Sequence, residues 1–100
     1  MIEVAEAIDK AIELFQLVHK DLVAAGEIVE LLVEEAEFST DQNSWTITLG
    51  YSRQGEVSTS TIGEALGQIN PKLTRRFKTF RIDAESGRVQ SMKTPKVGGV

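Results

Sequence analysis

The segment from Arg75 to Lys93 constrains the fold more than any other part of this sequence. A charged, aromatic-bearing stretch ending at Ile82 is followed by the turn sequence Asp83-Ala84-Glu85-Ser86-Gly87 and then by a second extended stretch. Strand-type residues thus flank a loop of about five residues in which Gly87 can adopt a positive φ, and such loops join antiparallel neighbours. The pattern predicts a β-hairpin with strands at about 74–83 and 88–95.

A further strand is predicted at about 44–53, because residues 45–51 alternate strictly. The larger apolar side chains fall on one side and small or polar ones on the other, namely Trp45, Ile47, Leu49 and Tyr51 against Thr46, Thr48 and Gly50. This is the pattern of a half-buried antiparallel strand. The preceding stretch, 28–38, fits either a helix or a strand. The turn-forming residues 39–44, and the need of 44–53 for a partner, favour a strand.

Residues 3–23 are predicted to form an amphipathic helix. Apolar residues recur at spacings of three and four and therefore share one stripe: Val4, Ala7, Ile8, Ala11, Ile12, Phe15, Val18 and Leu22. Acidic residues gather in its first turns, as the helix dipole favours. Gly26 is a suitable left-handed cap after this helix.

Residues 54–72 lack alternation and are predicted to form a long loop that contains one short helix. Thr61 and Glu64 have the spacing of a capping box, and Asn70-Pro71 would end that helix. One hundred residues suffice for one domain, 1–100. The expected fold class is α+β, with one N-terminal amphipathic helix packed on a four-stranded antiparallel meander sheet.

At two places the sequence resembles the PepSY-like domains, which are cystatin-like in fold. In that family a tryptophan typically opens a strand, as Trp45 opens Trp45–Leu49 here, and a "V-D-A-x-T-G-x-V" hairpin lies near the end. Ile82 through Val89 matches this hairpin with Ser86 in the threonine position. The resemblance implies a small bacterial interaction or inhibitory module of the kind found in peptidase propeptides. Because the hairpin motif looks structural, it transfers no catalytic residue.

Charge and composition exclude several classes of protein. Eleven of the fifteen acidic residues lie in positions 1–50, whereas nine of the eleven lysines and arginines lie in positions 51–100. The simplest explanation is that the two halves pack together and offset one another's charge. The chain has no cysteine, and hence no disulfide, thiolate nucleophile or zinc-thiolate site. An acidic start and the lack of an apolar run of ~20 residues indicate a cytoplasmic protein outside the membrane.

The sequence contains no recognisable catalytic, cofactor-binding or metal-binding pattern. His19 is the only histidine and has no evident nucleophile or orienting partner, so we expect it to be a surface or interface residue. Glu34, Glu35 and Glu37 could hold a hard cation, but such acids more often protect an exposed strand edge. The glycines at 63 and 67 lack the lysine of a phosphate-binding loop. No enzyme activity and no cofactor are therefore expected.

The leading hypothesis is a non-enzymatic module that binds or inhibits another macromolecule, with a protein as the expected partner, through the sheet face or the 52–72 loop; homodimerisation is an addition. One alternative is a small-ligand pocket between helix and sheet, marked by inward-pointing His19, Tyr51 or Arg53. Another is a single-stranded nucleic-acid binder that uses the basic, aromatic-bearing hairpin. The candidate partner-binding residues are Trp45, Tyr51, Arg53, Arg75, Arg76, Lys78 and Arg81.

Overall fold

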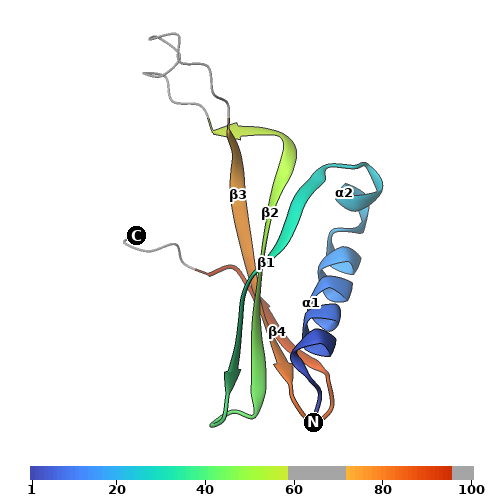
Figure 1. The fold of residues 1–100 in the computed structure, drawn as a ribbon. Coiled ribbons are helices and arrows are strands. Elements are labelled where there is room, and N and C mark those ends of the chain that lie inside the picture. Colours follow the sequence, from blue (N-terminus) through green and yellow to red (C-terminus); the bar gives the residue numbers. More distant parts are fainter. Residues whose placement is uncertain (59–71, 96–100) are drawn as a thin grey trace.

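The fold is one helical layer on one antiparallel sheet (Figure 1). The computed structural model describes residues 1–58 and 72–95. Its elements, in chain order, are α1 (Val4–Val18), α2 (Lys20–Ala24), β1 (Ile28–Ser39), β2 (Ser44–Ser58), β3 (Lys72–Asp83) and β4 (Val89–Lys93). The strands lie in the order β1-β2-β3-β4, and every neighbouring pair is antiparallel. The predicted α+β meander is confirmed, and the ambiguous stretch 28–38 is a strand.

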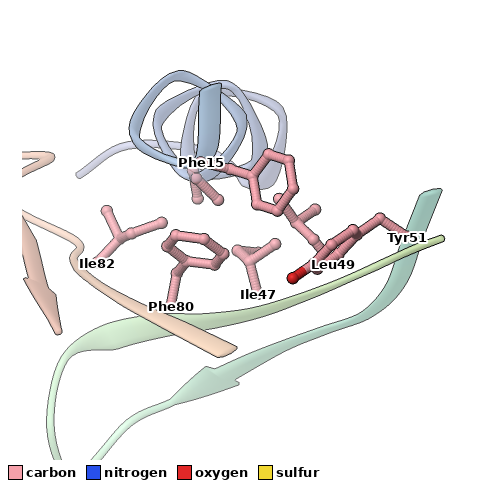
Figure 2. Packing of buried hydrophobic residues seen from close by; sticks show 8 residues of the cluster. Phe15, Ile47, Leu49, Tyr51, Phe80 and Ile82 are labelled. Carbon is pink, nitrogen blue, oxygen red and sulfur yellow. The ribbon is translucent and has the colours of Figure 1, made fainter. Parts of the chain in front are cut away.

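The core lies between α1 and one side of the sheet (Figure 2). On α1, two fully buried alanines at spacing i, i+4 allow the helix backbone to approach the strands, and Phe15 fills the space one turn further on. The sheet contributes the alternating apolar side chains that the sequence predicted. The buried cluster consists of Ala7, Ala11, Phe15, Ile47, Leu49, Tyr51, Phe80 and Ile82.

Backbone hydrogen bonds connect the first residues of the chain to two turns of the sheet. The backbone N–H of Ile2 donates to the Ala84 carbonyl at 2.7 Å, and the Ala84 N–H donates to the Asn43 carbonyl at 3.0 Å. Asn43 itself has φ +47°, a left-handed turn conformation that asparagine tolerates well. These bonds tie the start of α1 to the β1–β2 and β3–β4 turns and fix the direction in which the helix crosses the sheet.

The expected helix 3–23 is divided into two at His19. This residue has φ −106° and ψ +27°, outside the helical region, and both its backbone N–H and its ring Nδ1 lie 3.0 Å from the Phe15 carbonyl oxygen. Since a carbonyl can only accept, Nδ1 carries a proton and donates to it. The histidine side chain thus caps α1, and α2 begins at the next residue.

Several strand boundaries differ from those expected. β2 continues to Ser58 and β3 begins at Lys72, so 54–58 and 72 belong to strands although they were placed in the 54–72 loop. The ladder has a register shift between Ser52 and Val57, where β2 contains extra residues, and this shift interrupts the alternation by which a strand is recognised in sequence. β4 ends at Lys93 instead of 95, shortly before Pro95, which lacks the N–H that a ladder needs. The predicted short helix at Thr61–Asn70 lies outside the described residues.

Truncating the aromatic side chain at the centre of the core should destabilise the protein strongly. Phe15→Ala removes a fully buried ring that packs on Tyr51 with ring centroids 4.8 Å apart. We expect the free energy of unfolding to fall by about 3–5 kcal/mol. Urea unfolding followed by circular dichroism measures this loss. Leu17→Ala on the same helix is the matched control, because Leu17 is 67% exposed and its truncation should change stability by less than about 0.5 kcal/mol. A similar loss in both variants would contradict the core described here.

Candidate functional site

The side of the sheet opposite α1 is the candidate functional surface, here named the open face. Side chains of directly paired residues on neighbouring strands point to the same face, so the ladder register assigns each strand residue to a side. Within the part of the chain that the structure describes, the helices lie on the other side of the sheet (Figure 1). The open face consists of Val29, Leu32, Glu35 and Glu37 of β1, Thr46, Thr48, Gly50 and Ser52 of β2, Arg75, Phe77, Thr79 and Arg81 of β3, and Ser91 and Lys93 of β4.

Arg75 is the best-anchored polar side chain of the open face. Its guanidinium donates from Nη1 to the Glu30 backbone carbonyl at 2.7 Å and to Ser52 Oγ at 3.4 Å. Nη2 donates to Glu34 Oε1 at 2.7 Å, and the Glu30 carboxylate lies 3.8 Å from Nη1. One arginine of β3 therefore reaches across β2 and holds β1 through a planar fork that lysine lacks.

Two irregularities in β1 make this reach feasible. Between Val29 and Leu32, and again between Val33 and Glu35, β1 contains one more residue than the β2 segment it faces. Glu30, within the first bulge, has φ +54°, which turns its carbonyl out of the regular ladder and toward Arg75. A left-handed glutamate is uncommon, so the arginine contact helps to compensate for its backbone strain.

Gly50 lies directly beneath the Arg75–Glu34 ion pair. A Cβ atom at this position would be 2.5 Å from Glu34 Oε1 and 2.7 Å from Arg75 Nη2. Glycine within a strand often marks such a close approach. The missing side chain leaves a shallow site in the open face, which the two charged side chains occupy.

Phe77 and a row of threonines form the middle of the open face. Phe77 pairs in register with Gly50 and is half-buried, whereas Phe80 pairs with Ile47 on the other side and is fully buried. The two phenylalanines therefore lie on opposite faces of the sheet. Thr48 Oγ1 and Thr79 Oγ1 lie 3.3 Å apart, a hydrogen bond between β2 and β3. The surface combines an aromatic ring, threonine methyl groups and hydroxyls.

The basic residues predicted to bind a partner do not share one face. Arg75 and Arg81 lie on the open face, whereas Arg76 and Lys78 pair with Tyr51 and Leu49 and point to the helix side. Lys78 Nζ donates to Thr94 Oγ1 at 2.5 Å. Hence these four cations do not form one strip along which a nucleic-acid backbone could bind, and Arg75 is engaged by two carboxylates.

Arg53, another candidate, is paired with a carboxylate. Its guanidinium lies 3.7 Å from Glu27 Oε1, beside the start of β1. Both side chains are about one third exposed or more, so this ion pair contributes little to stability. Arg53 therefore joins the basic second half of the chain to the acidic first half, as the charge distribution indicated.

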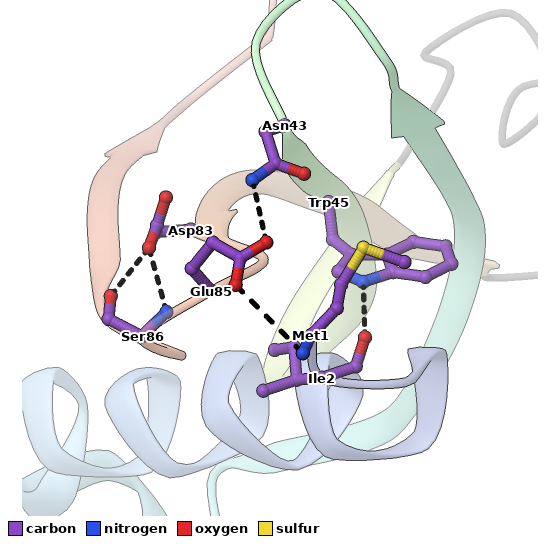
Figure 3. Close-up of polar contacts among 7 residues, drawn as sticks. All are labelled: Met1, Ile2, Asn43, Trp45, Asp83, Glu85 and Ser86. Atoms are coloured by element: carbon purple, nitrogen blue, oxygen red, sulfur yellow. Dashed lines mark hydrogen bonds and ion pairs between the residues drawn. The ribbon is translucent and has the colours of Figure 1, made fainter.

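The two remaining candidates, Trp45 and Tyr51, belong to the helix side. Trp45 packs against the core, and its indole Nε1 donates to the Ile2 carbonyl at 3.2 Å (Figure 3). Tyr51 is only 4% exposed. Phe15 stacks on His19 with ring centroids 4.3 Å apart and meets Tyr51 edge-on. These aromatic rings contact one another directly instead of lining an open site.

The β3–β4 turn is stabilised by hydrogen bonds between its own residues. Asp83 Oδ2 accepts from the Ser86 hydroxyl at 2.7 Å and from the Ser86 backbone N–H at 2.8 Å (Figure 3). These two bonds lower the pKa of the Asp83 carboxyl because they favour its charged form. Gly87 follows with φ +74°, the left-handed conformation expected from the sequence. An open depression of about 430 Å³ beside this turn is lined by Asp83, Ser86, Arg88, Val89 and Gln90.

Neither a metal-binding cluster, nor a membrane-spanning helix, nor a similarity to known proteins identifies a further site in the described residues. In residues 1–58 and 72–95, no three or more histidine, aspartate or glutamate side chains gather as they would around a metal ion. No helix among the described residues is long and apolar enough to span a membrane. Comparison of the chain with protein-family models, with curated proteins and with solved structures finds no match in any of the three.

Sequence reasoning missed the residues that organise the open face around Arg75. Glu30, Ser52 and Gly50 were not among the candidates, and Glu34 was considered only as a cation ligand or an edge-protecting acid. The glycine in the middle of an alternating strand was the one signal available, since it suggests a close approach. The bulges that bring Glu30 and Glu34 to Arg75 leave no pattern in the sequence.

Replacing Arg75 should weaken the attachment of β1 to the sheet. Arg75→Met keeps much of the apolar stem and removes the guanidinium, and we expect the free energy of unfolding to fall by about 1–2 kcal/mol, because its bonds are only partly shielded from water. Arg75→Lys should recover less than half of that loss, since an ammonium cannot bond to both Glu30 and Glu34 with a fork. Chemical denaturation measures both variants. Full rescue by lysine would show that only the charge matters.

The lowered pKa of Asp83 predicts a contribution to acid stability. A carboxyl whose pKa is lower in the folded than in the unfolded chain stabilises the fold above its unfolded pKa, which is about 3.9. That contribution is lost as the pH falls through the folded pKa. Asp83→Asn should therefore be less stable than wild type at pH 6, and the difference should shrink below about pH 4. Thermal unfolding between pH 2.5 and pH 6 measures the difference. Asp41→Asn, in the other turn, is the control, and equal behaviour of the two variants would contradict the assigned role of the Ser86 bonds.

Proposed function

We propose that this chain is a non-enzymatic module that binds another protein through the open face of its sheet. The observation that carries the proposal is the position of Phe77. Its ring stands half-buried on the side of the sheet that has no helix over it in the described residues, beside Gly50 and the threonine row. Aromatic residues are enriched at the centres of protein interfaces, where they contribute much of the binding energy.

The surroundings of Phe77 suit a protein partner better than a polyanion. Glutamates of β1 lie on the same face as Arg75 and Arg81 of β3, so the surface presents both signs of charge with apolar and hydroxyl groups between them. Such a mixture is typical of protein interfaces with a polar rim. The PepSY-like resemblance of Ile82–Val89 is a second support, and the cytoplasmic location expected from the sequence belongs to the same proposal.

The non-enzymatic part of the proposal is supported by how the polar side chains are engaged. Arg75 is held by Glu30 and Glu34, and the Asp83 carboxylate is held by Ser86. These groups act as structural partners for one another instead of converging on an exposed reactive centre. Turnover of a substrate by the pure protein, lost on substitution of a single polar residue, would overturn this part.

Binding through the open face predicts that Phe77→Ser abolishes partner retention. The tagged protein is passed over lysate of its own source at moderate salt, and the retained protein is identified and purified for titration calorimetry. We expect Phe77→Ser to weaken binding by roughly tenfold or more, the effect of losing a central aromatic contact. Leu17→Ser is the matched control, because Leu17 is exposed and belongs to α1, which packs on the other side of the sheet. Unchanged binding by Phe77→Ser, or a loss confined to Leu17→Ser, would place the interface elsewhere.

A further inference from the structure

We propose that the open face binds a second copy of this chain, face to face, about a two-fold axis that runs along the strands. This inference rests on the proposed function, because it names the partner of the same surface. The proposed dimer is a sandwich of two four-stranded sheets in which α1 of each copy lies on the outer side. Sheets packed face to face in this way keep their strand directions nearly aligned.

The first argument is the distribution of charge across the open face. Glu35 and Glu37 lie on β1 at one edge, whereas Lys93 lies on β4 at the other edge and Arg81 on β3 next to it. Glu35 and Lys93 are at the same height, because the ladder runs from Glu35 through Thr48 and Thr79 to Lys93. The face is therefore negative along one side and positive along the other.

A two-fold axis along the strands brings these opposite charges together. It reverses the strand order but keeps each residue at its height, so β1 of one copy lies over β4 of the other. Glu35 then faces Lys93 of the second copy, and Glu37 is next to Arg81 of the second copy. The symmetry repeats both pairs, which gives four oppositely charged pairs around the threonine row.

The other symmetric arrangements place like charges together. An axis across the strands would put β1 over β1, so the glutamates of both copies would gather along one edge and the cations along the other. Edge-to-edge pairing of two β1 strands would also bring glutamates together, and the two bulges in β1 interrupt the regular edge that pairing needs. Like-charge contacts across an interface are strongly unfavourable. Charge thus selects one arrangement among the three.

The second argument is the apolar pair Leu32 and Phe77. Both lie at the height of Gly50, and Leu32 is 57% exposed at the β1 edge. β4 pairs with β3 only from Thr79 to Ile82, so at the height of Phe77 the described residues provide no fourth strand. In the proposed arrangement, Leu32 of the second copy occupies that position beside Phe77. The dimer would therefore shield two apolar side chains per copy.

The size of the open face sets the expected affinity. Three strands of about nine residues and the five-residue β4, spaced about 4.8 Å apart at about 3.3 Å per residue, cover roughly 500 Å² per copy. A standard stable interface buries about 800 Å² per partner, so this face suits a weak dimer. We expect dissociation constants of order micromolar, with affinity falling as salt screens the four charge pairs.

Charge reversal with complementation tests the proposal. Sedimentation equilibrium of the pure protein over a concentration series should show a monomer–dimer equilibrium. A double variant, Glu35→Lys with Glu37→Lys, and a second, Arg81→Glu with Lys93→Glu, should each dimerise roughly tenfold or more weakly alone. An equimolar mixture of the two should restore dimerisation as a heterodimer. Asp9→Lys with Glu13→Lys changes the net charge equally on exposed positions of α1 and should leave wild-type dimerisation unchanged.

Each outcome bears on the proposal. Circular dichroism first establishes that both double variants are folded, and a variant that is not is replaced by its single substitution Glu35→Lys or Lys93→Glu. A wild-type monomer at millimolar concentration, or dimerisation that survives both reversals, overturns the second copy as partner. If the protein is monomeric while a lysate partner is still lost on Phe77→Ser, the dimer fails and the proposed function stands. If neither self-association nor Phe77-dependent capture occurs, both fail.

Discussion

The contact between α1 and the sheet is the interaction on which the rest of the structure depends. Ala7 and Ala11 bring the helix backbone close to β2 and β3, and Phe15 fills the remaining space against Tyr51. The burial of this stripe removes the apolar side of the sheet from water, which is the main favourable term in folding. Because residues 1–58 and 72–95 supply one long helix, this contact covers one face of the sheet, and the other face carries polar residues together with Leu32 and Phe77.

The uneven charge along the sequence is resolved by pairing between its two halves. Arg53 pairs with Glu27, and Arg75 pairs with Glu30 and Glu34, so acids of the first half meet bases of the second across β1, β2 and β3. The open face keeps the remaining asymmetry, with carboxylates at the β1 edge and cations at the other. Because the two edges of the face carry opposite charge, a charged partner is favoured in one orientation over the others.

Most of the fold was predictable because it rests on local patterns. The strand alternation around Ile47 and the turn chemistry at Gly87 each specify a local conformation, and both are found in the structure. The break at His19 was not predictable, because the histidine fits the helical periodicity and acts through a bond to a backbone carbonyl. The Arg75 site was missed for a related reason, since its partners depend on bulges and cross-strand register.

By itself the sequence determined the α+β class, the helix stripe and the side of β2 that is buried, because periodicity and turn residues act over a few neighbouring positions. Only the tertiary structure decided which cations share a face, that Gly50 lies beneath an ion pair, and where Trp45 finds its hydrogen-bond partner. These features depend on strand register, in which a shift of one residue exchanges the two faces of a sheet. The bulges of β1 and β2 produce such shifts in register. The spacing of residue types along the sequence does not predict where these bulges occur.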